Sequence, residues 1–458
     1  MHYGLQEQPT LDHRSRSVLA KLLFALLGLA ALVAGYLLFA SEETQVTALS
    51  AMPKALGYAS AVKVRASNPQ GVKGISAWIE QNGSKYQLIE KNYPGGWMDW
   101  IRKDRPPVEI EFTVGKDRAP GLVAGKAKLI VEAQANNLRA VRSRLTQELP
   151  VVLGKPKLEV SKDPVFLRRG GTGVVVFRAG GDWSEAGVKV GNYVFPSYPS
   201  QGDANRRIAI FGFPPEAPRE TTPLIYASNL AGDEVTEPFP HHVTAVEFRQ
   251  REVKIGDPFL ARVVPAVEEG SAGQGALWER FARINSKVRR ENDNFLAGLK
   301  EKSGAAPLWK GAFQLLPKSA NQAQFADFRT YSYDGKELNR EWHLGVDLAS
   351  VKNAPVPAPN DGKVVFAGTL GIYGKCVVID HGLRVQSVYG HMSQLDVKEG
   401  DTVTKGQKMG NTGMTGLAGG DHAHIGLLLN GVFVDPVEWS LPKWMEKSLM
   451  PAVASIAK

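Results

Sequence analysis

Cysteine is nearly absent from this sequence: Cys376 is the only one among 458 residues. A single cysteine excludes an intrachain disulfide, so the fold is not held together as a disulfide scaffold. Cys376 lies in the apolar run KCVVID, which favours a buried small residue over a reactive nucleophile. The scarcity of cysteine remains compatible with export from the cell.

The sequence also lacks the motifs of nucleic-acid-binding proteins, such as a zinc finger or an aromatic RNA-binding signature. No nucleic-acid partner is therefore expected, although the formal net charge is +9. A basic surface can instead favour anionic lipid or an anionic polymer, and it can equally be a generally solvated surface without a partner.

The length and composition predict several domains that are mainly β. A chain of 458 residues suggests roughly three units on a prior of about 150 residues each. The 47 glycines and 28 prolines favour short strands separated by many turns.

An uncharged apolar run of 19 residues, Leu22–Ala40, lies near the N-terminus and is long enough to cross a bilayer as a helix. Basic residues precede the run and two glutamates follow it, so the positive-inside rule places residues 1–16 in the cytoplasm. We interpret residues 17–41 as an uncleaved transmembrane signal-anchor. A cleaved signal peptide is the alternative, but Leu38 or Phe39 would occupy a position that normally holds a small residue.

Residues 45–243 show short alternating stretches, such as VKVRA at 62–66, separated by turn signals such as Asn82–Gly83. This pattern predicts two β-sandwich domains, at 45–153 and 154–243. They are immunoglobulin-like only in a loose sense, because no Cys–Trp–Cys pattern is present. Their expected role is spacing or docking.

Residues 244–305 form a connecting segment with a predicted helix over 275–300. Its apolar residues recur at helical spacing: Leu277, Phe281, Ile284, Val288, Phe295 and Leu299. The stripe predicts packing against a neighbouring domain, and binding of a partner is the alternative. Residues 306–444 return to short strands and glycine-rich turns and are predicted to form an all-β module, followed by a tail at 445–458.

The all-β module contains five of the nine histidines, and two of them form a His-x-His motif. Side chains at i and i+2 of a strand point to the same face, so His422 and His424 face one side while Ala423 and Ile425 face the other. Two imidazoles on one face can share a metal, or one can bind it while the other acts on bound water.

A second motif, HLGVD, places His343 four residues before Asp347. The spacing would suit one helix face, but the glycine and the surrounding turns favour a loop or strand. Two histidines and one aspartate suit a tetrahedral zinc with three protein ligands and one open position. Water at such a position has its pKa lowered toward about 7.

The module resembles the LytM/lysostaphin-type zinc endopeptidases of peptidase family twenty-three. The resemblance spans residues 343–436, about a fifth of the chain, and includes HLGVDLA, APVPAPNDGKVVFAG, YGKCVVIDHG, VYGHMSQLDVKEGDTVTKGQKMGNTGMTG, HAHIGL and FVDP in that order. It implies an all-β peptidase domain that binds one Zn²⁺ per chain. The implied ligands are His343, Asp347 and His424, and the implied catalytic residues beside the water are His391 and His422.

Two features of the family pattern have weaker counterparts here. Members commonly carry an FG-x-R stretch before the first histidine, and Arg329 stands roughly in that place. A tyrosine that stabilises the oxyanion in some members has Tyr331 and Tyr333 as candidates. His381 matches a family position that does not bind metal, and we interpret it as structural.

Together these features predict a membrane-anchored zinc endopeptidase that cleaves peptide cross-links of peptidoglycan. The anchor would make it a single-pass protein of a bacterial inner membrane, with the bulk of the chain periplasmic or extracytoplasmic. The alternative is a non-catalytic or latent scaffold that regulates cell-wall amidases. A regulatory protein partner stays open under either hypothesis.

Overall fold

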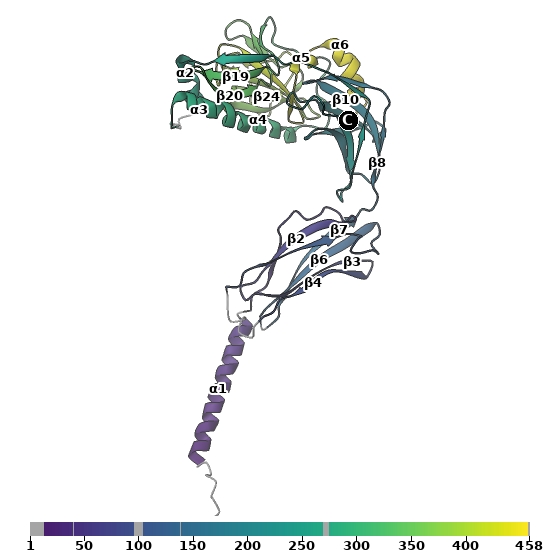
Figure 1. Ribbon diagram of the computed structural model, residues 1–458, viewed down its shortest axis with the longest axis vertical. Coiled ribbons are helices and arrows are strands. Elements are labelled where there is room, and N and C mark those ends of the chain that lie inside the picture. Colours follow the sequence, from purple (N-terminus) through teal and green to yellow (C-terminus); the bar gives the residue numbers. More distant parts are fainter. Residues whose placement is uncertain (1–12, 40, 96–103, 138, 269–273, 457–458) are drawn as a thin grey trace, which may run out of the picture. The chain divides into compact units, whose positions relative to one another are not determined.

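The computed structural model describes residues 13–39, 41–95, 104–137, 139–268 and 274–456, and it is mainly β (Figure 1). Contacts divide the chain into two units, Met1–Gly154 with Leu230–Asp233 and Lys155–Asn229 with Glu234–Lys458. Of the predicted cytoplasmic tail, residues 1–12 lie outside the described residues.

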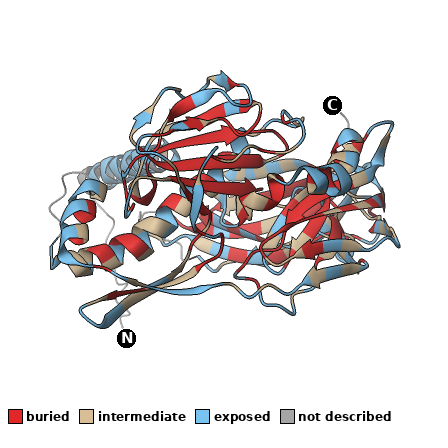
Figure 2. Ribbon diagram, turned by 90° about the horizontal axis from the view of Figure 1, so that it is seen from above, coloured by how far each residue is buried: buried red, intermediate tan, exposed pale blue. Residues whose placement is uncertain are grey.

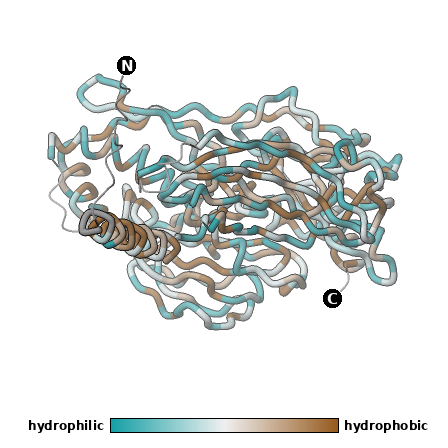
Figure 3. Tube along the Cα trace, turned by 90° about the horizontal axis from the view of Figure 1, so that it is seen from below, coloured by the Kyte–Doolittle hydropathy of each residue, from teal (hydrophilic) through white to brown (hydrophobic). Residues whose placement is uncertain are grey.

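An apolar helix, α1 (His13–Phe39), is the first described element. Within it, Ser17–Tyr36 is long and apolar enough to cross a membrane, and none of its residues is buried inside the protein. Figure 3 shows the apolar colour along this helix. The predicted N-terminal apolar helix is confirmed.

The first β region consists of two sheets that enclose one hydrophobic core. One sheet has the order β1 (Gln45–Ala48), β2 (Ser60–Ser67), β5 (Val108–Val114), and the other has β4 (Ser84–Asn92), β3 (Val72–Gln81), β6 (Gly125–Ala135), β7 (Arg142–Val151). Along β2, Val62 and Val64 are buried between exposed residues, as the alternation predicts. The turn between β3 and β4 uses Asn82 at φ 50° and Gly83 at φ 79°, which confirms the predicted Asn-Gly turn.

The second β region is one seven-stranded sheet that bends back on itself. Its order is β15 (Glu234–Pro238), β14 (Leu224–Ser228), β11 (Glu185–Val190), β12 (Tyr193–Ser200), β13 (Asp203–Gly212), β10 (Thr172–Gly181), β8 (Pro156–Val160). Strand β12 forms a corner, because its first half pairs with β11 and its second half with β13. The edge strands β8 and β15 contact each other, and a parallel pair, β9 (Val165–Arg168) with β16 (His241–Thr244), lies beside the sheet. In the second β region one curled sheet therefore encloses the core, whereas in the first β region two separate sheets enclose a core of their own.

The connecting segment begins with a strand, β17 (Gln250–Lys254), and is helical after it, as the apolar stripe predicts for 275–300. The helical part comprises α2 (Asp257–Val267), α3 (Leu277–Arg283), a π-helical turn η2 (Ile284–Val288), α4 (Arg289–Gly298) and η3 (Leu299–Lys302). Phe281, Ile284 and Leu299 of the stripe are buried in the same core as the strands that follow. Phe295 is 42% exposed but packs edge-on against Phe366.

The C-terminal region is built on an eight-stranded sheet. Its order is β18 (Ala320–Ala323), β21 (Val346–Ala349), β29 (Ala423–Leu429), β25 (Val385–Met392), β24 (Gly374–Asp380), β23 (Gly362–Leu370), β27 (Thr402–Val403), with β30 (Val432–Val434) on β29. Two small sheets flank it: β17 (Gln250–Lys254), β19 (Phe328–Tyr333), β20 (Lys336–Trp342), and β22 (Pro355–Pro357), β28 (Lys408–Asn411), β26 (Gln394–Leu395). Short helical elements complete it: η4 (Gly371–Tyr373), α5 (Pro436–Trp439), α6 (Pro442–Trp444), η5 (Met445–Leu449) and α7 (Met450–Ala454).

The second β region and the C-terminal region share one hydrophobic core. Figure 2 colours all buried residues of the chain red. Trp439 is fully buried in this core, and its indole Nε1 donates a hydrogen bond of 2.9 Å to Thr172 Oγ1 of β10. The stretch interpreted from sequence as a tail, 445–458, contributes buried Met445 and Leu449 to the same core. The two regions therefore support each other.

A buried carboxyl at this contact gives a pH-dependent prediction. Burial raises the pKa of Glu438 to about 7, although its side chain accepts a hydrogen bond from Thr172 N at 2.7 Å. The folded-state pKa exceeds the ordinary value, so the folded protein holds this proton more tightly than the unfolded chain does. The stability that the protonated carboxyl contributes is therefore complete below about pH 4.5 and is lost as the pH rises through 7. We expect Glu438→Gln to remove about 3 kcal/mol of this pH dependence, measured from urea midpoints at pH 5 and pH 8. Equal pH dependence in both proteins would contradict the prediction.

Candidate metal centre

Three neighbouring strands of the eight-stranded sheet position the candidate site. Asp347 in β21 lies directly opposite His424 in β29, and His424 lies opposite Gly390 in β25, next to His391. His343 is in the loop just before β21, and His422 is just before β29. The sheet therefore brings together residues that are up to 81 positions apart in the sequence.

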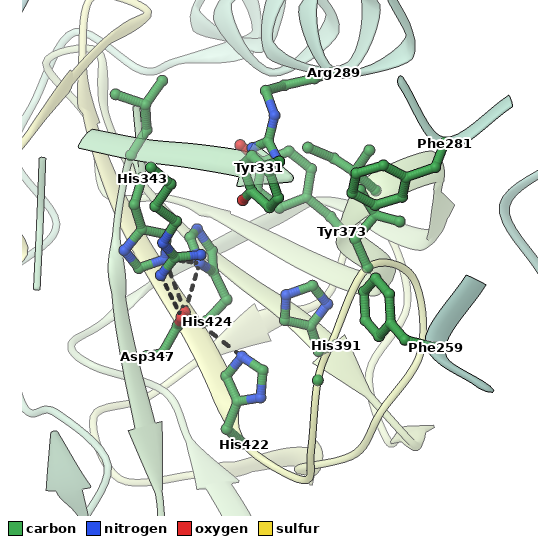
Figure 4. A pocket seen from close by; sticks show the side chains of 15 residues that line it. Phe259, Phe281, Arg289, Tyr331, His343, Asp347, Tyr373, His391, His422 and His424 are labelled. Atoms are coloured by element: carbon green, nitrogen blue, oxygen red, sulfur yellow. Dashed lines mark hydrogen bonds and ion pairs between the residues drawn. The ribbon is translucent and has the colours of Figure 1, made fainter. Parts of the chain in front are cut away.

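Three ligand atoms converge on one point (Figure 4). His343 Nε2 lies 2.9 Å from Asp347 Oδ1 and 3.1 Å from His424 Nδ1, and the last two atoms are 3.0 Å apart. Adjacent ligands of a tetrahedral metal with bonds of about 2.0–2.1 Å stand about 3.3 Å apart. The spacing and the N/O donor set therefore fit a metal ion bound by these three side chains.

Backbone carbonyls orient three of the four imidazoles in the site. His343 Nδ1 lies 2.9 Å from the carbonyl oxygen of Gln324. His391 Nδ1 lies 2.8 Å from that of Thr415, and His422 Nδ1 lies 2.8 Å from that of Gly420. An Nδ1–H that donates to a carbonyl leaves Nε2 free to face the pocket. His424 is reversed: Nδ1 faces the other ligands, while Nε2 is buried without a partner among the described residues.

Gly345 of the HLGVD motif is required by close packing against His424. A Cβ at this position would lie 2.6 Å from His424 Nε2 and Cε1 and 2.7 Å from Ile425 O. Any larger residue would displace the imidazole or the backbone of β29, so the motif needs glycine between its two ligands.

The second oxygen of Asp347 is held by Arg329, whose Nη2 lies 3.1 Å from Oδ2. Burial alone would raise the pKa of Asp347, but the electrostatic influence of His343 and hydrogen bonds from His343, His422 and His424 hold that pKa well below its usual value. The carboxylate therefore stays ionised, as a metal ligand must. Arg329, suggested from the sequence, does reach the site.

His391 is placed by an irregularity in β25. The pairing of β24 with β25 shifts register beside it, and His391 adopts φ 62°, a left-handed conformation that is costly for a residue other than glycine. Its ring centroid lies 4.8 Å from that of His422, whose Nε2 is 3.5 Å from Asp347 Oδ1. Burial and the nearby histidines lower the pKa of His391, whereas Asp347 outweighs burial and raises the pKa of His422.

The remaining residues singled out from the sequence divide between the pocket and its surroundings. Tyr331 lines the pocket, whereas the Tyr333 hydroxyl donates to Asp257 Oδ1 at 2.9 Å, away from it. His381 is fully buried, between the Asp361 carbonyl and the Ser387 hydroxyl at 2.8 Å each, and burial lowers its pKa to about 4. That environment suits a structural histidine.

Sequence reasoning missed the residues that form the far wall of the pocket. Tyr373 is adjacent to the ligands, with its ring 5.5 Å from that of His424, and its hydroxyl donates to Asp293 Oδ1 of α4 at 2.8 Å. Phe259 of α2 and Phe281 of α3 also line this pocket (Figure 4). Tyr373 belongs to the YGKCVVIDHG run that carries the resemblance, whereas nothing in the sequence places the phenylalanines near the ligands.

Comparisons with known proteins agree with this geometry. Residues 341–436 match the model of peptidase family M23. The DD-carboxypeptidase/endopeptidase Mpg of Neisseria meningitidis is 39% identical over 22% of this chain and 23% of its own length. The peptidoglycan DD-endopeptidase ShyA of Vibrio cholerae is 36% identical over 22% of this chain and 23% of its own length. The chain thus matches less than a quarter of the length of these two relatives.

Among solved structures, the catalytic domain of the antimicrobial peptidase lysostaphin from Staphylococcus simulans is 26% identical. The match covers 29% of this chain and 98% of that one, with a TM-score of 0.25. The family match, the sequence relatives and the three converging ligand atoms lead to one conclusion. Toward its C-terminal end, the chain carries a peptidase family M23 domain.

Proposed function

We propose that this chain is a zinc-dependent endopeptidase that hydrolyses DD-peptide cross-links of peptidoglycan. The observation that carries the proposal is the convergence of His343 Nε2, Asp347 Oδ1 and His424 Nδ1 beside two further imidazoles. The substrate is inferred from the names of the two relatives described above, a DD-carboxypeptidase/endopeptidase and a peptidoglycan DD-endopeptidase.

The chemistry follows from the positions of the side chains. Zinc held by His343, Asp347 and His424 would supply Lewis acidity toward a water molecule and the scissile carbonyl. His391 and His422 both line this pocket, each with its Nδ1 beside a backbone carbonyl, which leaves Nε2 as the nitrogen available to the reaction. Between them they move one proton from the attacking water to the leaving nitrogen, so that the C–N bond breaks and the products are an amine and a carboxylic acid, which then gives up its remaining proton to become a carboxylate. Arg329 keeps Asp347 in the orientation that binds metal.

The rest of the chain would hold this site outside the cell membrane. Helix α1 serves as a single-pass anchor in the bacterial inner membrane, because Ser17–Tyr36 has the required length and apolar character. The β regions at 45–153 and 154–243 serve as immunoglobulin-like spacers, and the helical segment joins them to the peptidase region at 306–444. The periplasm is then the compartment in which enzyme and peptidoglycan meet.

A non-catalytic scaffold that regulates amidases is the weaker alternative, because every ligand and both additional histidines are present.

A latent enzyme, whose active site is held partly closed, is better supported by a specific observation. Phe259 of α2 and Phe281 of α3 line the metal pocket, and Arg262 of α2 donates hydrogen bonds to the carbonyls of Ala418 at 2.6 Å and Met414 at 3.3 Å. Helix α2 thus lies against the loop that borders the site. We propose that the enzyme is active but partly closed by this helix, which a regulatory partner could displace.

The proposal is tested by mass spectrometry of purified peptidoglycan after incubation with the full chain. We expect cross-linked muropeptides to be converted into monomers whose masses identify the DD bond. Chelation should stop the reaction, and added Zn²⁺ should restore it. Unchanged cross-links in the presence of zinc, from protein that binds one zinc per chain, would refute this substrate.

A further inference from the structure

Asp327 is a buried carboxylate outside the metal pocket that the proposed mechanism does not use. Its side chain is 1% exposed, and it receives two hydrogen bonds from Arg249: Nε to Oδ1 at 2.9 Å and Nη2 to Oδ2 at 2.7 Å. The pairing of β17 with β19 sets this contact, because Gln250 and Phe328 are register partners. Arg249 and Asp327 both precede the stretch that matches the peptidase family, 341–436.

Asp327 also closes a tight turn. Its Oδ2 accepts a hydrogen bond of 3.2 Å from Gln324 N, and its own N–H donates to Gln324 O at 3.3 Å. Ala326, inside the turn, has φ 60°, a conformation that normally calls for glycine. Such a turn persists only where the surroundings hold it, and here the Arg249–Asp327 pair supplies that support.

The turn leads directly to the first metal ligand. The Gln324 carbonyl lies 2.9 Å from His343 Nδ1. The His343 backbone is fixed to the same turn on both sides, since Ala326 N donates to His343 O at 2.7 Å and His343 N donates to Asp327 O at 2.9 Å. The ring and the backbone of His343 therefore both depend on the shape of this turn.

We propose that Asp327, clamped by Arg249, is a positioning residue for the metal site: it fixes the turn whose Gln324 carbonyl selects the His343 tautomer with Nε2 directed at the metal. This inference rests on the metal site of the proposed function. It makes residues outside the matched peptidase stretch part of that site. Partners that orient a ligand histidine typically change metal affinity by about 10- to 100-fold when they are removed.

The test is the zinc dissociation constant of the full chain in detergent, measured by competition with a chromophoric chelator. We expect Asp327→Asn to raise the dissociation constant at least about tenfold. Arg249→Gln, at a position whose side chain is 45% exposed, should raise it in the same direction without preventing folding. The control is Asn360→Ala, which removes a buried side chain that accepts hydrogen bonds from Lys310 N and Asp361 N but contacts no ligand.

Each outcome of this experiment has a distinct meaning. The positioning role is supported if the dissociation constant rises in the Asp327 and Arg249 variants but does not rise in Asn360→Ala, when all three lose a comparable amount of melting temperature. A dissociation constant within twofold of the unaltered chain in both variants would overturn that role and leave the metal site intact. If the unaltered chain bound no zinc, the metal site would fall and this inference with it.

Discussion

Replacing His422 by alanine is expected to lower kcat on peptidoglycan by about 10²- to 10⁴-fold while the chain still binds one metal ion. Loss of a general acid or base typically has this effect. His422 supplies none of the three converging ligand atoms, and its Nε2 lies 3.5 Å from Asp347 Oδ1. His391→Ala is expected to behave alike, because the ring centroids of the two histidines are 4.8 Å apart. His343→Ala should differ by losing the metal itself.

Metal content separates the two classes of variant. Zinc is measured per chain by atomic emission, next to release of muropeptide monomers by chromatography. His242→Ala serves as the matched control, since this histidine lies in β16 and does not line the metal pocket. If His422→Ala lost its zinc, His422 would be a ligand and the assignment of His424 would have to be revised.

Weakening helix α2 is expected to increase activity. Arg262→Ala combined with Phe259→Ala removes two hydrogen bonds to the loop carbonyls of Met414 and Ala418 and one aromatic wall of the pocket. If these contacts favour a closed state by about 2 kcal/mol, kcat/KM should rise about thirtyfold, because each 1.4 kcal/mol is a factor of ten. The measurement is the initial rate of cross-link cleavage at low substrate concentration.

The matched control for this prediction is Arg290→Ala, which removes an exposed arginine of α4 that does not line the pocket. It should leave the rate unchanged. A double variant that folds, binds zinc and cleaves no faster than the unaltered chain would show that α2 does not restrict the site. The chain would then be a constitutively open enzyme rather than a latent one.

The metal ligands could be proposed from sequence because their spacing carries the information. His422 and His424 stand two residues apart, and His343 and Asp347 frame a glycine that close packing requires. The apolar stripe that begins at Leu277 likewise predicted a helix, because a helical repeat is a local property of the chain.

Contacts between distant segments could not be predicted in this way. The bond from Tyr373 to Asp293 joins residues 80 positions apart, and the pair of Arg249 and Asp327 joins residues 78 apart. Their proximity depends on how strands pair, which one sequence does not reveal. The curling of the second sheet has the same origin, since it depends on β12 changing partners at its midpoint.

The core shared by the second β region and the C-terminal helices also sets the order of events during biosynthesis. Thr172 and Trp439, which are hydrogen-bonded in that core, are 267 residues apart. At 5–20 residues per second a ribosome needs roughly 15–50 s to synthesise that interval. For this time the strand that carries Thr172 lacks its C-terminal cover, so the nascent chain exposes an apolar surface on which a chaperone can act. A stop codon shortly before Trp439 would leave that surface permanently uncovered, and the product should aggregate even though every metal ligand is present.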